Sequence, residues 1–286
     1  MRKMYFLGAH VWFVALWGLL FLPSVSWAGG DGRKSDGLSL WYDRPATQWM
    51  EALPLGNGRL GAMVYGGTHT ERLALNESTM WSGEEDPEQH KYFGHEMLDG
   101  LRKLFFAGKI IEGNHIAWDN LVGTPHSFGT HLPIGDLRLD FTYPRGEVEG
   151  YRRSLDLTDA VCRVDYEVGG VHYAREYFAS NPDELLVVRL TADKKGSLTF
   201  GVSLDLMREA EVKAEYGLLR FDGQALFPMH GKGGVHFEGR IRVLAEKGTV
   251  EANGCRIEVR NADAVTLLVD CLLYTSDAAD DMQCVD

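Results

Sequence analysis

A glycine-rich stretch at residues 53–67 has the spacing of a dinucleotide-binding turn. It reads LPLGNGRLGAMVYGG, in which Gly56, Gly58 and Gly61 fit the pattern G-x-G-x-x-G, and Glu77 follows at about the distance of a ribose-binding acid. Such a site needs a strand, the turn, and then a helix whose N-terminus faces the pyrophosphate. Only four residues follow Gly61 before the next glycine pair, which leaves no room for that helix. The glycines are therefore predicted to form a turn and to allow another backbone segment to approach closely.

Side chains that could bind a sugar gather in the loop LNESTMWSGEEDP. Trp81 could stack on the C–H face of a sugar while its indole N–H bonds a hydroxyl, and Asn76 and Glu77 could bond hydroxyls beside it. The structural alternative is that Trp81 plugs an interface while Asn76 and Glu77 tie the loop to backbone amides. His126 and His131 bracket a further loop that could face a ligand or simply bond backbone groups.

The elements that must position these loops are predicted to be mostly strands. Residues 59–67 and 70–77 are short apolar-rich runs joined by a glycine turn, and the second alternates leucine with polar or small residues, which indicates a hairpin. From 95 to 120 the spacing becomes helical and predicts two short helices broken near Gly108. From residue 135 onward, strands follow one another with short turns. This order favours a mainly β protein, a large antiparallel β-sandwich (super-sandwich) with two short helices inserted near residues 95–120.

The first 28 residues are predicted to be a secretory signal. Two basic residues precede a long apolar run, and Ser26 and Ala28 give the small-x-small pattern of a cleavage site. An uncleaved membrane anchor is the alternative, because the apolar run is long for a signal core. Cleavage would make the protein secreted or periplasmic in a bacterium, with residues 29–37 as a short linker.

The net charge and the spacing of the cysteines limit which partners, metals and cofactors the protein is expected to bind. Without the signal, 27 basic residues face 41 acidic ones, a net charge of −14. Such a chain repels nucleic acid and anionic membranes, so neither is expected as a partner after cleavage, whereas a neutral sugar is compatible. None of the four cysteines forms a C-x-x-C pair, and no H-E-x-x-H or G-x-S-x-G motif is present. We therefore predict no metal and no other cofactor.

Long collinear motifs cover roughly residues 38–270. They read LWYDRPATQWMEALPLGNGRLGAMVYGG, ERLALNESTMWSG, PIGDLRLDF, YRRSLDL, VGGVHYAREYFASNPDELLVVRLTADKKGSLTF and FEGRIRVLAEKGTVEANG. This region resembles the N-terminal domain of glycoside hydrolase family 95, which consists chiefly of secreted bacterial α-L-fucosidases, with some members acting on α-L-galactosides. The chain departs from the family pattern at Ser78 and Met80.

The resemblance implies a β-sandwich in front of a helical (α/α) barrel that carries the catalytic carboxylates and is expected downstream of the matched residues. Glycoside hydrolysis usually needs two acids across the scissile bond. No spacing distinguishes a pair in this chain, so no catalytic residue is assigned among its acids, which include Glu51, Glu77, Glu84, Glu85 and Asp86.

The expected function is the N-terminal sandwich of an exo-acting, inverting α-L-fucosidase, packed on its barrel and acting on fucosylated glycans. One alternative is a non-catalytic carbohydrate-binding or scaffold domain. Another is the N-terminal domain of an α-L-galactosidase or a related sugar phosphorylase.

The last residues, 271–286, read CLLYTSDAADDMQCVD and lack the alternation of the preceding strands. The segment LLYTSDAADD resembles translated sequencing-adaptor read-through, so this tail is expected to be non-native, together with Cys271 and Cys284. A natural short terminus with a disordered tail is the alternative.

Overall fold

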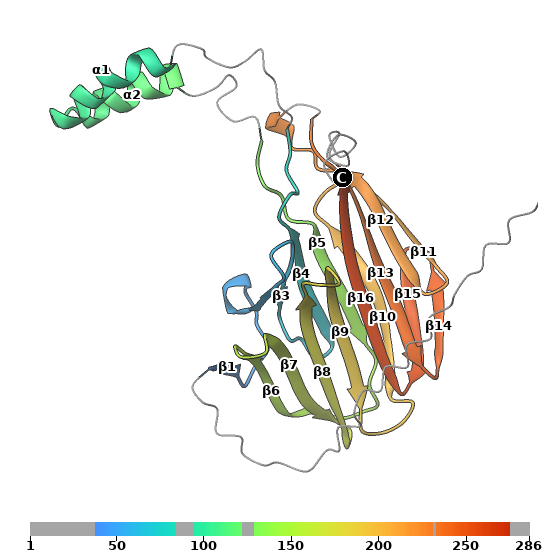
Figure 1. Ribbon diagram of the computed structural model, residues 1–286. Helices are drawn as coiled ribbons and strands as arrows, with labels where there is room; N and C mark the ends of the chain where they lie inside the picture. The colour runs from blue at the N-terminus through green and yellow to red at the C-terminus, as the bar shows by residue number, and fades with distance from the viewer. Residues whose placement is uncertain (1–37, 84–93, 122–128, 231–232, 275–286) are drawn as a thin grey trace, which may run out of the picture. The chain divides into compact units, whose positions relative to one another are not determined.

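The computed structural model describes residues 38–83, 94–121, 129–230 and 233–274, and these fold mainly into two antiparallel sheets (Figure 1). The mainly β sandwich with two helices that the sequence predicts is confirmed. The predicted signal and linker, residues 1–28 and 29–37, lie outside the described residues.

The larger sheet has nine strands, and the smaller has seven. The order across the first is β1 (Ser39–Tyr42), β6 (Val148–Asp156), β7 (Val161–Val168), β8 (Val171–Ser180), β9 (Leu185–Ala192), β16 (Ala264–Tyr274), β13 (His236–Glu246), β12 (Leu218–Gln224) and β11 (Ala210–Glu215). The order across the second is β14 (Thr249–Asn253), β15 (Arg256–Ala262), β10 (Leu198–Leu206), β5 (Gly135–Phe141), β4 (Thr70–Glu77), β3 (Leu60–Val64) and β2 (Leu53–Gly56). Two short 3₁₀ turns, η1 (Trp49–Glu51) and η3 (Pro228–His230), lie in the connections.

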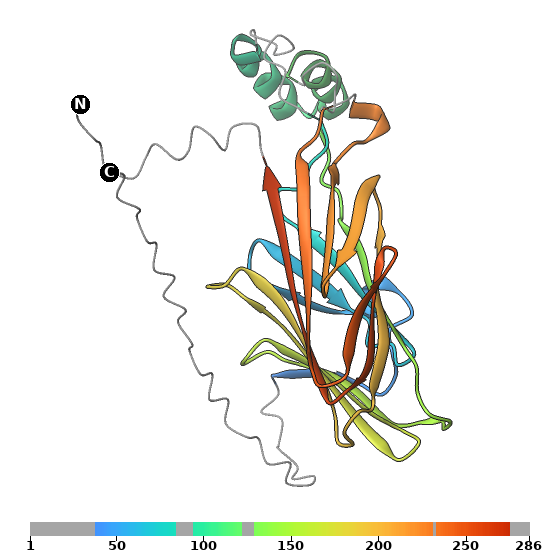
Figure 2. The ribbon, with the colours of Figure 1, turned by 90° about the vertical axis from the view of Figure 1, so that its right-hand side faces the viewer.

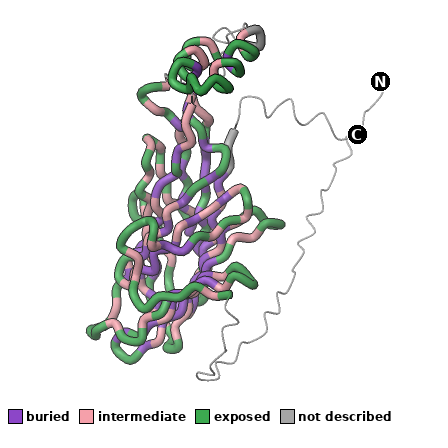
Figure 3. Tube along the Cα trace, turned by 90° about the vertical axis from the view of Figure 1, so that its left-hand side faces the viewer, coloured by how far each residue is buried: buried purple, intermediate pink, exposed green. Residues whose placement is uncertain are grey.

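Alternating burial along the strands explains why the sheets pack face to face. In β9 every second residue, Leu186, Val188 and Leu190, is buried, and in β4 Leu73 and Leu75 are buried in the same way. Successive side chains of a strand point to opposite faces, so these residues share the core between the two sheets. Figure 3 shows the buried residues running along the strands and the exposed ones at turns and outward positions.

The glycine-rich stretch is a β-hairpin turn between β2 and β3, as the sequence predicts. The Asn57 side-chain oxygen accepts hydrogen bonds from the backbone N–H groups of Arg59 (3.0 Å) and Leu60 (2.8 Å), which closes the turn, and Gly58 has a φ of +99°. A strand and no helix follows the glycines, so this stretch lacks the geometry of a dinucleotide site.

The two predicted helices are α1 (Gly94–Phe106) and α2 (Ile110–Leu121), which pack against each other. Gly108, with a φ of +76°, separates them. Gly113 lies where a Cβ would come within 2.5 Å of the Phe105 ring, so the close approach of the helices requires a glycine there. Helical spacing puts Met97, Leu98, Leu101, Leu104 and Phe105 on one face of α1, and of these only Leu101 is buried. Neither described helix has the length and apolar character needed to span a membrane.

Strand β16 continues beyond residue 270, the expected boundary of the domain. Its pairing with β13 runs to Tyr274, which lies opposite His236, and Cys271 is buried opposite Gly239. The first four residues of the segment expected to be non-native are therefore part of the sheet, while residues 275–286 lie outside the described part. In Figure 2 β16 and β13 stand side by side as two long strands.

Candidate functional site

Three segments far apart in the sequence meet beyond the end of β4, and we call this meeting place the junction (residues 80–83, 130–132 and 233–235). Isolated β-bridges join Trp81 to His131 and Ser82 to Gly234. Backbone hydrogen bonds run from Ser82 N to the Thr130 oxygen and from Val235 N to the Trp81 oxygen, each 3.0 Å. The candidate loop is thus held on both sides by backbone pairing.

Trp81 stands at the junction with its side chain about half exposed. Its ring meets the His131 ring edge to face, with centroids 5.6 Å apart, and its indole nitrogen donates to the Ser78 backbone oxygen at 3.2 Å. His131 Nε2 lies 3.0 Å from the Glu77 backbone oxygen. Three of the sequence-predicted residues are therefore brought together, and the indole N–H is already bonded within the chain.

The carboxylate of Glu77 has a local structural role. It is buried, and one oxygen accepts hydrogen bonds from the backbone N–H of Thr79 (2.7 Å) and from its hydroxyl (3.0 Å). Tying the loop to a backbone amide is what the structural alternative expects. Asn76 is exposed opposite Gly61, and His126 lies outside the described residues.

A serine–histidine contact at the junction escaped the sequence analysis. Ser82 Oγ lies 2.7 Å from His230 Nδ1, and it accepts a hydrogen bond from the backbone N–H of Thr130 at 3.1 Å. Such a pair can activate a nucleophile, but this hydroxyl is buried and its bonds close the junction. The partners are separated by 148 positions, so no local pattern could indicate the contact.

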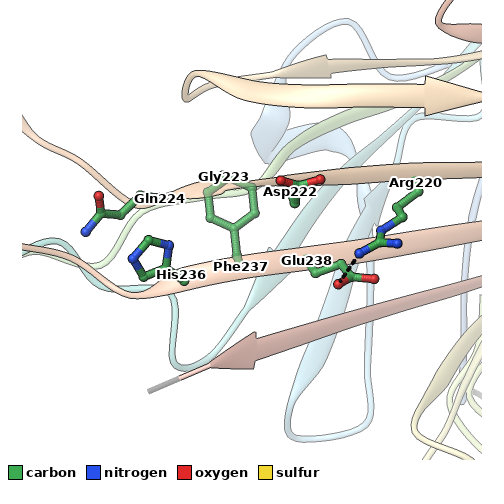
Figure 4. Close-up of a pocket in the computed structure, with 7 residues that line it drawn as sticks. All are labelled: Arg220, Asp222, Gly223, Gln224, His236, Phe237 and Glu238. Atoms are coloured by element: carbon green, nitrogen blue, oxygen red, sulfur yellow. Dashed lines mark hydrogen bonds and ion pairs between the residues drawn. The ribbon is translucent and has the colours of Figure 1, made fainter. Parts of the chain in front are cut away.

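A surface hollow of about 410 Å³ lies beside the junction, over β12 and β13 (Figure 4). Gln224 joins it to the junction, because its side-chain nitrogen donates to the Gly234 backbone oxygen at 3.0 Å. Sequence reasoning named none of the lining residues, which are Arg220, Asp222, Gly223, Gln224, His236, Phe237 and Glu238.

The acids considered as catalytic candidates show no paired arrangement in the described part of the chain. Glu51 accepts hydrogen bonds from the backbone N–H (2.8 Å) and hydroxyl (3.0 Å) of Thr47, and these bonds lower the pKa of its carboxyl. Glu84, Glu85 and Asp86 lie outside that part. Among the described residues no group of three or more histidine, cysteine or acidic side chains is placed to hold a metal ion.

Two comparisons with known proteins, one with family models and one with solved structures, describe what the chain is similar to. The family model described as "Glycosyl hydrolase family 65, N-terminal domain" matches residues 40–272. A solved structure titled "Putative kojibiose phosphorylase from human microbiome" has a TM-score of 0.47 at 9% identity, covering 87% of this chain and 34% of that one.

The curated relatives are fucosidases by name. "Alpha-L-fucosidase 2" of Arabidopsis thaliana is 40% identical over 171 residues, which cover 59% of this chain and 20% of the relative. "Probable alpha-fucosidase A" of Aspergillus niger is 33% identical over 183 residues, covering 60% and 22%. The chain thus spans about a fifth of the length of the curated relatives it matches.

The sequence resemblance and the comparisons differ only in the family number, since the resemblance names family 95 and the matching model names family 65. Both identify an N-terminal domain of a glycoside hydrolase, and the relatives carry fucosidase names. The match over residues 40–272 shows that the chain belongs to the family of glycosyl hydrolase family 65 N-terminal domains.

Proposed function

We propose that this chain is the N-terminal sandwich of a secreted, exo-acting α-L-fucosidase that inverts configuration and acts on fucosylated glycans. The observation that carries the proposal is the 40% identity to a protein named as an α-L-fucosidase. Glu51 and Glu77, the described acids among those considered, have local structural roles, which supports a non-catalytic part in the reaction. The catalytic acids would then lie on a barrel elsewhere in the same polypeptide.

The junction is the part of the sandwich that we propose to border the sugar. Trp81 presents a half-exposed ring on a loop that backbone pairing holds on both sides, so the ring is fixed before any ligand arrives. Because its N–H is bonded to Ser78, the ring can offer a stacking face but no further hydrogen bond.

The test compares the 286-residue chain with the protein encoded by the complete reading frame at the source locus. We expect the longer protein to hydrolyse 4-nitrophenyl α-L-fucoside, with β-L-fucose as the first product by NMR, and the shorter chain to show no turnover above buffer. General acid–base catalysis alone contributes about 10²- to 10⁴-fold in rate, so its absence should be plain. Turnover by the shorter chain would overturn the non-catalytic role. Preference for an α-L-galactoside, or sugar release that requires phosphate, would overturn the fucosidase assignment.

The role of the junction is tested by Trp81→Ala in the longer protein. If the ring borders the sugar, KM rises or kcat/KM falls while Tm barely moves. The matched control is Trp49→Ala, because Trp49 is similarly exposed but lies in η1. A large drop in Tm with unchanged kinetics would instead make Trp81 an interface plug.

Secretion is tested by the mass of the protein recovered outside the cytoplasm after expression in a bacterium. We expect a chain that begins at residue 29. An intact N-terminus in the membrane fraction would favour the uncleaved anchor.

A further inference from the structure

The hollow lies on the outward face of the nine-stranded sheet. In β12 the lining residues Arg220 and Asp222 alternate with Leu219 and Phe221, which are buried between the sheets. Side chains at alternate positions of a strand share a face, so Arg220, Asp222 and Gln224 form one outward row. Across the strand pair, Asp222 lies opposite Glu238, and Gln224 lies opposite His236 (Figure 4).

Glu238 forms the fixed end of the hollow. Its Oε2 is 2.9 Å from Arg220 Nη2, and its Oε1 is 2.8 Å from Arg240 Nε and 2.7 Å from Arg240 Nη2. The carboxylate is buried even though it faces outward, whereas both arginine side chains remain about half exposed. An arginine held in this way keeps its plane fixed and has further N–H groups for another acceptor.

Two polar side chains of the hollow make no hydrogen bond within the described part of the chain. These are Asp222 and His236, which both line the hollow, and Asp222 interacts electrostatically with Lys213 on the neighbouring strand β11. An ionised carboxylate offers only acceptors, and a neutral imidazole offers one donor and one acceptor. Together with Arg220, the hollow therefore presents donors and acceptors on two neighbouring strands.

The charge of the hollow selects the class of ligand. Two arginines face two carboxylates, Asp222 and Glu238, and an ion pair of β11 lies opposite the same row, with Lys213 Nζ 2.7 Å from Glu211 Oε1, so the set is neutral when His236 is neutral. An anion would have to compete with Glu238 for both guanidinium groups, and a cation would meet Asp222 together with the positive charge of Lys213, which interacts with it. A neutral molecule with adjacent hydroxyls can accept from arginine and donate to a carboxylate at once, without any unpaired charge.

We propose that this hollow is a second carbohydrate-binding site, which takes one neutral sugar unit of a glycan. Its volume of about 410 Å³ falls within the range of about 300–1,000 Å³ that is typical of small-molecule sites. Asp222 accepts from two neighbouring hydroxyls, Arg220 donates to a third oxygen, and His236 borders the far side. The inference goes beyond the proposed function, because it concerns a site outside the junction and needs no hydrolysis.

The experiment is saturation-transfer NMR on the whole 286-residue chain with L-fucose, L-galactose, D-glucose and N-acetylglucosamine as probes, each also titrated for its Kd. Inorganic phosphate and Ca²⁺ serve as the anionic and cationic probes. We expect at least one neutral sugar to bind, and Asp222→Ala to weaken its binding by about tenfold or more, since a charge-assisted hydrogen bond is lost. The matched control is Glu215→Ala, an exposed acid of β11 outside the hollow, which should leave Kd unchanged.

The remaining outcomes separate the hollow from other sites and from the fucosidase proposal. Trp81→Ala should leave this binding intact, and loss of binding in that variant alone would move the site to the junction and overturn the inference. Binding of phosphate or Ca²⁺ in place of sugars would overturn the neutral-ligand assignment, and no binding by any sugar would overturn the site itself. The result does not depend on fucoside hydrolysis, which is measured on the longer protein.

Discussion

Arg175 and Glu71 meet between the two sheets, whereas Arg220, Arg240 and Glu238 meet on the outward face of the nine-stranded sheet. The inner pair is fully buried, with Arg175 Nη1 3.0 Å from Glu71 Oε2. The outer arginines are about half exposed. The same two residue types are therefore placed in two environments within one domain.

The inner cluster leaves few groups for a ligand. Arg175 also donates to the backbone oxygens of Gly67 (2.7 Å) and Thr68 (2.9 Å), and Tyr177 donates to Glu71 at 2.6 Å. These bonds fasten the turn between β3 and β4 to β8. A buried charge is tolerated only when it is paired and hydrogen-bonded. The buried Arg175 and Glu71 therefore use their hydrogen-bonding groups within the protein. The outer cluster is exposed to solvent, and within the described part of the chain Asp222 and His236 beside it make no hydrogen bond. Burial thus separates a structural cluster from one that can bind.

Removal of the inner arginine should have the largest effect. Arg175→Met leaves the Glu71 carboxylate without its cation, and breaking a buried pair in this way costs about 3–5 kcal/mol. The free energy of unfolding of the whole chain, measured by urea titration near pH 7, checks this. Arg163→Met on β7 is the control, because Arg163 is partly exposed and pairs with the exposed Glu176. If both variants lost the same free energy of unfolding, burial would not distinguish the inner ion pair from an exposed one.

Removal of one hydroxyl from the inner cluster should have a smaller effect. Tyr177→Phe deletes the hydrogen bond to Glu71 while keeping the ring, and we expect a loss of about 1.5–3 kcal/mol, as for hydrogen bonds to charged groups. Urea titration again gives the value. If Arg175→Met and Tyr177→Phe belong to one network, their effects in the double variant will not add. Full additivity would argue against a single cluster.

The inner region should also make the protein sensitive to alkali. Burial raises the pKa values of Tyr177 and Cys162, and it raises the pKa of Cys271 to about 12. Above about pH 9 the unfolded chain therefore binds fewer protons than the folded one, so the free energy of unfolding falls as pH rises. The contribution of Cys271 to stability is complete below about pH 9 and is lost as the pH rises to about 12, while those of Tyr177 and Cys162 are lost at higher pH.

Urea titrations at several pH values from 8 to 10.5 measure that slope. Cys162→Ala should make it shallower by up to one proton, about 1.4 kcal/mol per pH unit. Cys255→Ala is the control, because Cys255 is exposed. A slope that Cys162→Ala leaves unchanged would show that this thiol does not contribute to the alkaline loss.

The smallest effect is expected for the outer cluster. Arg220→Met removes one partner of Glu238, but Arg240 still holds the carboxylate and solvent reaches the site, so the loss of stability should stay below about 1 kcal/mol. The measurement is the same urea titration. A loss as large as that of Arg175→Met would mean that the outer cluster is structural, and it would weaken the case for a binding hollow.

Much of the fold follows from the order of residues along the chain. Alternation of apolar and polar residues predicts the strands, because successive side chains of a strand point to opposite faces. Glycine pairs predict the hairpins, because the tight turns need residues that adopt a positive φ. The same reasoning excluded the dinucleotide turn, since the chain after Gly61 has no room for a helix. The two helices on either side of Gly108 were also predicted from local spacing.

The roles of the polar residues were decided only by tertiary structure. Alternation puts Glu71 and Glu77 on the core face of β4, but it cannot show that one meets Arg175 and the other meets Thr79. Trp81 and His131 were predicted as separate loop residues, and their ring contact depends on backbone pairing between segments.

The hollow was missed for the same physical reason. Read along the chain, Arg220, Asp222 and Gln224 look like the solvated face of an ordinary strand. They become one wall of a hollow only because β12 pairs with β13 in a register that sets Asp222 opposite Glu238 and Gln224 opposite His236. Local sequence determines which face of a strand a side chain occupies, whereas its partners come from strands whose alignment only the packed sheets decide.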